Sequence, residues 1–173
     1  KLLQRKIDKF LKDWKLTKKK MPLIVKGARQ IGKTASIMKF ATENYKDVIA
    51  INFVLQKKFK AIFDDSYEVD DIVRNITLID PSLKFEAGKT LIFFDELQDC
   101  PACATSLKAF CIDGRFDVIC SGSLMGINYR EIESNSVGYK QDYTMHSMDF
   151  EEFLWANGIS DAIISKLAEC LDN

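Results

Sequence analysis

One stretch constrains the fold of this chain more than any other, namely LIVKGARQIGKTAS at residues 23–36. A short apolar run breaks into a glycine-containing loop, which ends in Gly-Lys-Thr and leads into a segment with helical character. The pattern G-x-x-x-x-G-K-[ST] is met in full from Gly27 to Thr34. A loop of this kind needs a strand before it and a helix after it, so the stretch predicts an α/β unit.

The loop has the chemistry of a phosphate cradle. Gly27 and Gly32 let the backbone wrap so that successive N–H groups point at phosphate oxygens, and the next helix offers its positive end. We predict that Lys33 reaches the β- and γ-phosphates and that the Thr34 hydroxyl binds Mg²⁺. A plain strand-to-helix turn would not need both Gly32 and Lys33. The predicted nucleotide-binding segment also contains Ala28, Arg29, Gln30 and Ile31.

Strands and helices are predicted to alternate along the rest of the chain. Apolar runs predict strands at 21–26, 47–53, 90–96 and 116–123, with a fifth within 138–148. Helices are expected at 33–45, in pieces over 57–79, at 101–114, at 149–158 and from about 160. This order predicts a three-layer α/β sandwich with a mostly parallel central sheet.

Two further stretches carry polar groups to the ends of strands. In LIFFDELQ, Asp95 and Glu96 end an apolar strand, where ligands of open α/β sheets bind. We predict that Asp95 holds Mg²⁺ and that Glu96 orients and polarises the attacking water, because phosphoryl transfer depends mostly on positioning and charge. In CSGS, Ser123 or Ser121 is placed to sense a γ-phosphate. Gln98 is a candidate contact for the water or for a partner.

Composition indicates a globular chain. With 173 residues, 47% of them hydrophobic and 29% charged, we expect one domain with a single core. No apolar run approaches the ~20 residues that span a bilayer, so we expect no membrane contact and a cytoplasmic location. The five cysteines are expected to be reduced thiols. Cys100 and Cys103 have the spacing of half a zinc site, but a second pair is missing.

The charge is unevenly distributed. Residues 1–20 contain nine Lys or Arg and two Asp, a local net charge of +7 in a chain whose net charge is zero. Apolar residues recur there at helical spacing, at Leu3, Ile7, Phe10, Leu11 and Trp14. We favour a packed helix with a solvated basic face, and the alternative is a contact with nucleic acid or another anionic surface. We divide the domain into this basic helix and linker (1–20), a nucleotide-binding core (21–145) and C-terminal helices (146–173).

Four stretches together resemble the bacterial and archaeal AAA-like P-loop ATPases that carry a C-terminal domain of unknown function. They are WKLTKKKMPLIVKGARQIGKT, LIFFDELQDCPACATSLKAF, DVICSGSLMGI and YTMHSMDFEEFLWANG. The resemblance implies an additional-strand sheet of the RecA/AAA type, with the sensor strand between the phosphate-loop strand and the acidic strand. It implies ATP and Mg²⁺ as ligands, with Lys33 and Thr34 as Walker A residues, Asp95 and Glu96 as Walker B, and Ser123 or Ser121 as sensor 1.

Two departures from that family affect the expected function. Its members are generally longer, so an attached C-terminal domain or a second copy of the chain is expected as a partner. Arg74, Arg115 and Arg130 are arginine-finger candidates without supporting context, and Arg29 lies in the phosphate loop itself. Without a finger, hydrolysis should be slow.

These features predict an ATP-binding and ATP-hydrolysing module that couples MgATP to a conformational change in an attached domain or partner. One alternative is an ATP-dependent switch that does not hydrolyse. A second is a nucleic-acid-associated ATPase that uses the basic N-terminal segment. The DxxG and NKxD patterns of GTPases are missing from the sequence.

Overall fold

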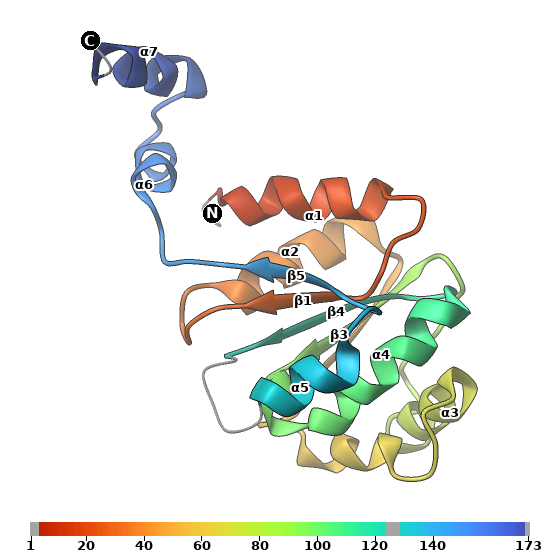
Figure 1. Cartoon of the computed structure of the whole chain (residues 1–173). Helices are drawn as coiled ribbons and strands as arrows, with labels where there is room; N and C mark the ends of the chain where they lie inside the picture. The colour runs from red at the N-terminus through yellow and green to blue at the C-terminus, as the bar shows by residue number, and fades with distance from the viewer. Residues whose placement is uncertain (1–3, 124–128, 172–173) are drawn as a thin grey trace.

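The computed structural model describes residues 4–123 and 129–171. Its centre is a sheet of five parallel strands in the order β2-β3-β4-β1-β5 (Figure 1). The strands are β1 (Leu23–Lys26), β2 (Asp47–Asn52), β3 (Thr90–Asp95), β4 (Asp117–Gly122) and β5 (Gln141–Thr144). Because β4 lies between β1 and β3, the predicted additional-strand sheet and the α/β fold class are confirmed.

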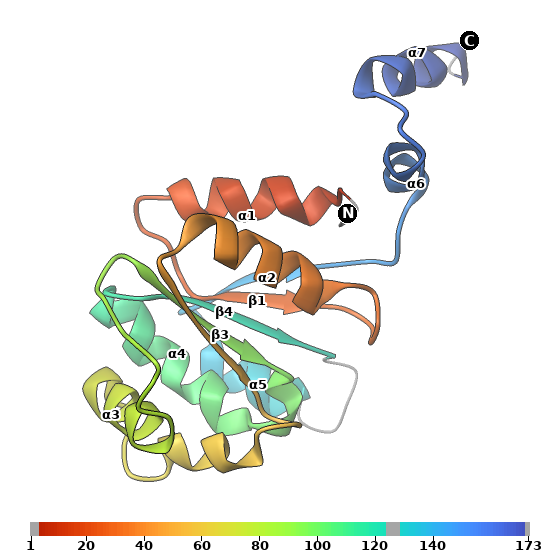
Figure 2. The ribbon, with the colours of Figure 1, turned by 180° about the vertical axis from the view of Figure 1, so that it is seen from behind.

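Helices cover both faces of the sheet and form the two outer layers (Figures 1 and 2). One face carries α1 (Lys6–Leu16) and α2 (Lys33–Asn44). The other carries α3 (Val69–Ile79), α4 (Pro101–Asp113) and α5 (Tyr129–Ser136), with short 3₁₀ turns η1 (Lys57–Phe63) and η2 (Leu97–Asp99). After β5 the chain forms α6 (Phe150–Ala156) and α7 (Asp161–Leu171), which project from the body.

The sheet is buried on both faces, and β3 shows how. Ile92 and Phe94 pack on the α3–α4 side, where Phe110 of α4 meets the Phe94 ring at 6.2 Å between centroids. Leu91 and Phe93 pack on the α1–α2 side. Full burial of side chains of this size contributes about 1.5–3 kcal/mol each. The central strand therefore holds the two outer layers to one sheet.

The basic N-terminal segment is a packed helix. Ile7, Leu11 and Trp14 of α1 are buried against the sheet and α2, as the favoured interpretation predicted. Phe10 contacts the Tyr143 ring of β5, with 4.4 Å between ring centroids. Leu3, which belonged to the same predicted stripe, lies outside the described residues.

The observed elements differ from the predicted ones in two respects. Sequence patterns predict no helix over 129–136, yet α5 occupies this segment. Only Ile132 and Ser136 of α5 are buried, so an apolar period is nearly absent there.

β1 begins at Leu23 and not at residue 21, because Pro22 has no N–H to donate to a strand ladder. Among the described residues, no helix is both long and apolar enough to cross a bilayer.

Candidate nucleotide site

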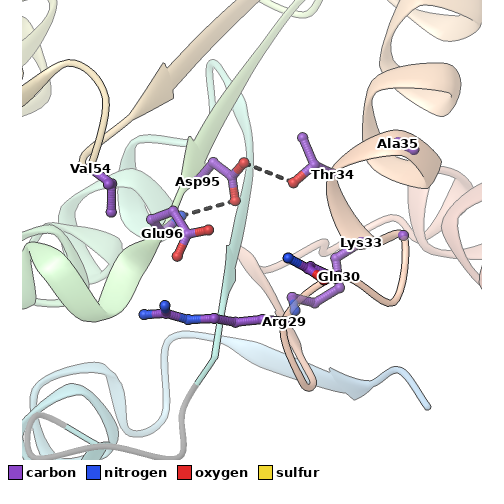
Figure 3. Close-up of a pocket in the computed structure, with 9 residues that line it drawn as sticks. Arg29, Gln30, Lys33, Thr34, Ala35, Val54, Asp95 and Glu96 are labelled. Atoms are coloured by element: carbon purple, nitrogen blue, oxygen red, sulfur yellow. Dashed lines mark hydrogen bonds between the residues drawn. The ribbon is translucent and has the colours of Figure 1, made fainter. Parts of the chain in front are cut away.

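The candidate site is a cleft of about 540 Å³ at the edge where the parallel strands end. Residues of the glycine loop, the start of α2 and the end of β3 surround it (Figure 3). The lining side chains and backbone belong to Arg29, Gln30, Gly32, Lys33, Thr34, Ala35, Val54, Asp95 and Glu96. The fold thus brings the predicted phosphate loop beside the predicted acidic strand end.

The two glycines of the loop are needed for different reasons. A Cβ on Gly27 would lie 2.4 Å from the carbonyl oxygen of Met145 and 2.7 Å from Cδ1 of Ile31, so there is no space for a side chain. Gly32 has φ of +94° and stands as the N-cap of α2, a left-handed conformation that glycine adopts without strain. Gln30 adopts φ of +60° although it has a side chain. The loop is therefore tightly wound.

Lys33 points back into its own loop. Its side chain is 8% exposed, and its ammonium donates hydrogen bonds to the carbonyl oxygens of Gly27, at 2.9 Å, and Ala28. Burial lowers the pKa of Lys33, while the neighbouring Glu96 and Asp95 carboxylates act in the opposite direction. A cation is thus held at the cradle by neutral carbonyl groups.

Thr34 and Asp95 are joined directly. The Thr34 hydroxyl donates to Oδ2 of Asp95 at 2.8 Å, and the Asn52 amide lies 3.5 Å from the same oxygen. Among the described residues, no group of three or more His, Cys, Asp or Glu side chains could hold a metal. Mg²⁺ usually takes one or two protein oxygens and completes its shell with water and substrate phosphates. A hydroxyl beside a buried carboxylate fits that requirement.

Glu96 lies on the opposite wall of the cleft from the loop (Figure 3). Its backbone is left-handed, with φ of +60°, and its N–H donates to Oδ1 of Asp95 at 2.9 Å. Its carboxylate accepts a hydrogen bond from Nε2 of Gln98. The other end of that amide, Oε1, accepts the backbone N–H of Ser123 at 3.2 Å. Gln98 therefore contacts the acidic strand end and the end of β4, contacts that the sequence did not indicate.

The two candidate sensor serines occupy different positions at this edge. Ser121 is the strand neighbour of Asp95 in the register of β3 and β4, and of Val25 in the register of β1 and β4. Its hydroxyl is fully buried and has no hydrogen-bond partner among the described residues. Ser123 follows β4 and is half-buried. Neither serine lines the cleft itself, but Ser121 is the strand neighbour of Asp95, which does.

Arg5 is a site neighbour that sequence reasoning missed. One guanidinium nitrogen donates to the carbonyl oxygen of Ile31 in the glycine loop, and another to that of His146 after β5, each at 2.9 Å. Its Nε lies 3.2 Å from the buried carboxylate of Glu152 in α6. An Asp149–Glu152 capping box begins α6, and no sequence pattern indicated the arginine that meets it.

The arginine-finger candidates lie in different surroundings. Arg115 pairs with Asp70 just before β4 begins, at the sheet edge opposite the cleft. Arg74 and Arg130 are exposed on α3 and α5. Arg29 is the one arginine among the described residues that lines the cleft.

Cys100 and Cys103 belong to the hydrophobic core. Both pack with Cys120 in the cluster between α4 and the sheet. Burial raises the pKa of Cys100 and of Cys103, so their thiols stay protonated at neutral pH.

Comparison with known proteins supports the fold that carries this cleft. A search of curated proteins found no match. The yeast S. cerevisiae Hsp104–ADP complex is similar over 91% of this chain, with 14% identity and a TM-score of 0.57. A structure of Drosophila ORC bound to DNA is similar over 87%, with 15% identity and a TM-score of 0.55. C. elegans PCH-2 is similar over 84%, with 11% identity and a TM-score of 0.49.

The chain spans only part of those three proteins, 24% of the Hsp104 chain and 44% of each of the other two. At identities this low, the likeness to the Hsp104 and ORC structures shows the fold alone. The family model described as an AAA domain matches residues 19–154, which include the whole glycine loop, the acidic strand end and all five strands. On that match over most of its length, this chain belongs to the AAA domain family.

Proposed function

We propose that this chain is an ATPase module, which binds MgATP between the glycine loop and the end of β3 and hydrolyses it slowly on its own. The observation that carries the proposal is the 2.8 Å hydrogen bond between the Thr34 hydroxyl and the Asp95 carboxylate. Both predicted magnesium ligands come together although 61 residues separate them in sequence. A strand-to-helix turn without a ligand would not require that pairing.

The loop N–H groups and four side chains of the cleft have a proposed part in hydrolysis. The loop N–H groups and the Lys33 ammonium hold the phosphates, because a charge-assisted bond to phosphate is stronger than the present bonds to neutral carbonyls. Mg²⁺, held by Thr34 and Asp95, would neutralise phosphate charge. Glu96 orients a water and accepts its proton as the water oxygen bonds to the γ-phosphorus. The bond to the bridging oxygen breaks, and ADP and inorganic phosphate leave.

The proposed roles of the serines rest on their position. Ser121 has a buried hydroxyl without a partner, and a polar group of this kind is costly unless a ligand or water completes its bonding. Ser123 follows it at the end of β4. We propose Ser123, with Ser121 beneath it, as the contact for the γ-phosphate.

We also propose that the nucleotide state is passed to an attached C-terminal domain or partner through α6. Arg5 supports this because it bonds to the glycine loop at Ile31 and pairs with Glu152 of α6. A change in the loop would alter the position of α6, the helix that leaves the body.

We also propose a cytoplasmic location, which fits the five free cysteines.

A second candidate is an ATP-dependent switch that does not hydrolyse. It is favoured by one observation, namely that Arg29 is the one arginine of the described residues in the cleft. A transition-state arginine would then have to come from a second copy or from another part of a longer chain.

The test is ATP binding and single-turnover hydrolysis with Mg²⁺, on the wild type, Lys33→Ala and Glu96→Gln. We expect the wild type to hydrolyse ATP and Glu96→Gln to bind it but turn over at least about 100-fold more slowly. Lys33→Ala should bind about tenfold or more weakly. Lys84→Ala, an exposed lysine at the opposite sheet edge, is the matched control and should behave as the wild type. Tight binding without turnover in the wild type would favour the switch, and no binding would contradict both candidates.

A further inference from the structure

Gln98 uses both ends of its side-chain amide. Nε2 donates to the Glu96 carboxylate and, at 3.1 Å, to Oδ2 of Asp99, while Oε1 accepts the Ser123 N–H. A carboxamide has two donor hydrogens on nitrogen and acceptor capacity on oxygen alone. The reverse orientation would face its oxygen toward two carboxylates and its NH₂ group toward another N–H. Its neighbours therefore fix one orientation of this amide.

Gly122, the last residue of β4, leaves the space through which Gln98 passes. A Cβ at Gly122 would lie 2.6 Å from Oε1 of Gln98 and 3.3 Å from the backbone nitrogen of Leu97. Gly122 does not have a positive φ, unlike six other glycines among the described residues. A glycine here leaves room for the Gln98 amide and does not serve a left-handed backbone conformation.

Glu96 is the group that this contact holds. Its left-handed backbone is unusual for a residue with a side chain, and such conformations persist only where the surroundings determine them. A glutamate side chain has several rotatable bonds, so an unrestrained carboxylate would sample many positions. One carboxylate oxygen accepts from Gln98, and the other is left to act on a ligand in the cleft that Glu96 lines.

We propose that Gln98 is a positioning residue, which ties the Glu96 carboxylate to the end of β4 and so orients it toward the attacking water. This role rests on the proposed ATPase function. Since a misplacement of about 1 Å can slow a reaction ~100-fold, the tie acts on the hydrolysis step. It has little effect on ATP affinity, because Gln98 does not line the phosphate cleft. The link also joins the proposed general base to the segment that carries Ser123.

The experiment measures ATP affinity and the single-turnover rate for the wild type, Gln98→Ala, Gln98→Glu and Gly122→Ala. We expect Gln98→Ala to hydrolyse about 10–100-fold more slowly with less than about a twofold change in Kd. Gln98→Glu keeps the length but replaces the donor with a carboxylate, so it should be as slow as alanine. Gly122→Ala should be slow as well, because its methyl group displaces Gln98. In the Glu96→Gln background, Gln98→Ala should add little further loss.

The outcomes separate this role from the function on which it rests. A wild type without turnover overturns both. A wild type that hydrolyses, with Gln98→Ala at the wild-type rate or faster, overturns the positioning role alone. Equal losses of affinity and rate, or a Gln98→Glu variant as fast as the wild type, would show a merely structural role and also overturn it. Lys84→Ala again serves as the unchanged control.

Discussion

At the scale of single residues, the glycine loop depends on space at one end and on backbone conformation at the other. Gly27 sits against the Met145 carbonyl after β5, and Gly32 begins α2 with a left-handed backbone. Because of this close approach, the start of the glycine loop packs directly against the backbone that follows β5. Any side chain there would have to separate the two segments.

Gly27→Ala should therefore lower the free energy of unfolding by about 2–3 kcal/mol, because its methyl group meets backbone atoms that cannot rotate away. Gly88→Ala is the matched control. Gly88 has φ of +77° but nothing within 4 Å of a new Cβ, so the cost there is about 1 kcal/mol from conformation alone. Urea unfolding of both variants measures the difference, and equal losses would contradict a packing cause at Gly27.

From the sequence, the placement of single residues can be predicted where the pattern is local. The positions of Lys33, Thr34 and Asp95 follow from a loop pattern and a strand end, and the structure brings them together. The contacts of Gln98 and Arg5 could not be predicted in this way. Each joins segments far apart in the chain through a side chain and a backbone group, and backbone groups leave no trace in the sequence.

At the scale of elements, α6 is attached to the body through the first turn of α1. Glu152 of α6 is 5% exposed, pairs with Arg5, and accepts the backbone N–H groups of Lys6 and Asp149. These partners offset the cost of burying the Glu152 carboxylate. This contact joins the N-terminal helix α1 to the first helix after the sheet.

Removing one member of that pair should be strongly destabilising. Arg5→Ala and Glu152→Ala should each lower the free energy of unfolding by about 3 kcal/mol, since each leaves a buried charge without its partner. The double variant should lose less than the sum, because no unpaired charge remains. Lys12→Ala, on the exposed side of α1, is the control and should change little. Additive losses in urea unfolding would refute the coupling.

A second ion cluster connects α5 to the sheet and makes stability depend on pH. Glu133 of α5 accepts from Lys26 of β1 at 2.5 Å and from Lys140 at 2.9 Å. Burial alone would raise the pKa of Glu133, but these hydrogen bonds outweigh it and hold the pKa below its ordinary 4.5. Burial also lowers the pKa of Lys26, and its bonds to Glu133 and Asp142 outweigh that effect and raise it to about 12.

The contribution of Glu133 is therefore complete above pH 4.5 and is lost as the pH falls through its lower folded value. Glu133→Gln should be about 1 kcal/mol less stable than the wild type at neutral pH. The difference should shrink steadily below pH 4.5, as urea unfolding at a series of pH values would show. A difference that stayed constant on acidification would mean that the charge of Glu133 does not contribute.

Sequence patterns predicted the elements that have a strong apolar pattern and missed α5, which has almost none. The runs that became β1, β3 and β4 are almost wholly apolar, and all three were expected. α5 buries only Ile132 and Ser136, and its tie to the sheet is the ion cluster around Glu133. An ion pair between distant segments gives no periodic signal, so the helix could not be predicted.

At the scale of the whole molecule, buried hydrophobic cores hold the three layers together, whereas α7 contributes no buried side chain among those described. The layers share two continuous cores on either side of the sheet. Every α7 side chain that the structure describes is exposed or half-exposed, and Trp155 of α6 bonds to Asp161 of α7 at 2.7 Å. The stability of the body should therefore be independent of α7.

Ending the chain after Gly158 should change the free energy of unfolding by less than about 0.5 kcal/mol, because the removed residues bury little surface on the body. Urea unfolding of the shortened and full chains measures this, with ATP affinity as a second readout that should also stay unchanged. A loss comparable to that of Glu152→Ala would mean that α7 supports α6 in its place.

The tight fit between Gly122 and Gln98 also has a consequence for how relatives of this chain can diverge. A larger residue at 122 alone is penalised, since a methyl group there meets the amide at 98. The path to a larger residue at 122 passes through a shorter side chain at 98 first. These two positions should therefore change together, so that a glutamine two residues after the strand-end glutamate coincides with a glycine between the two serines.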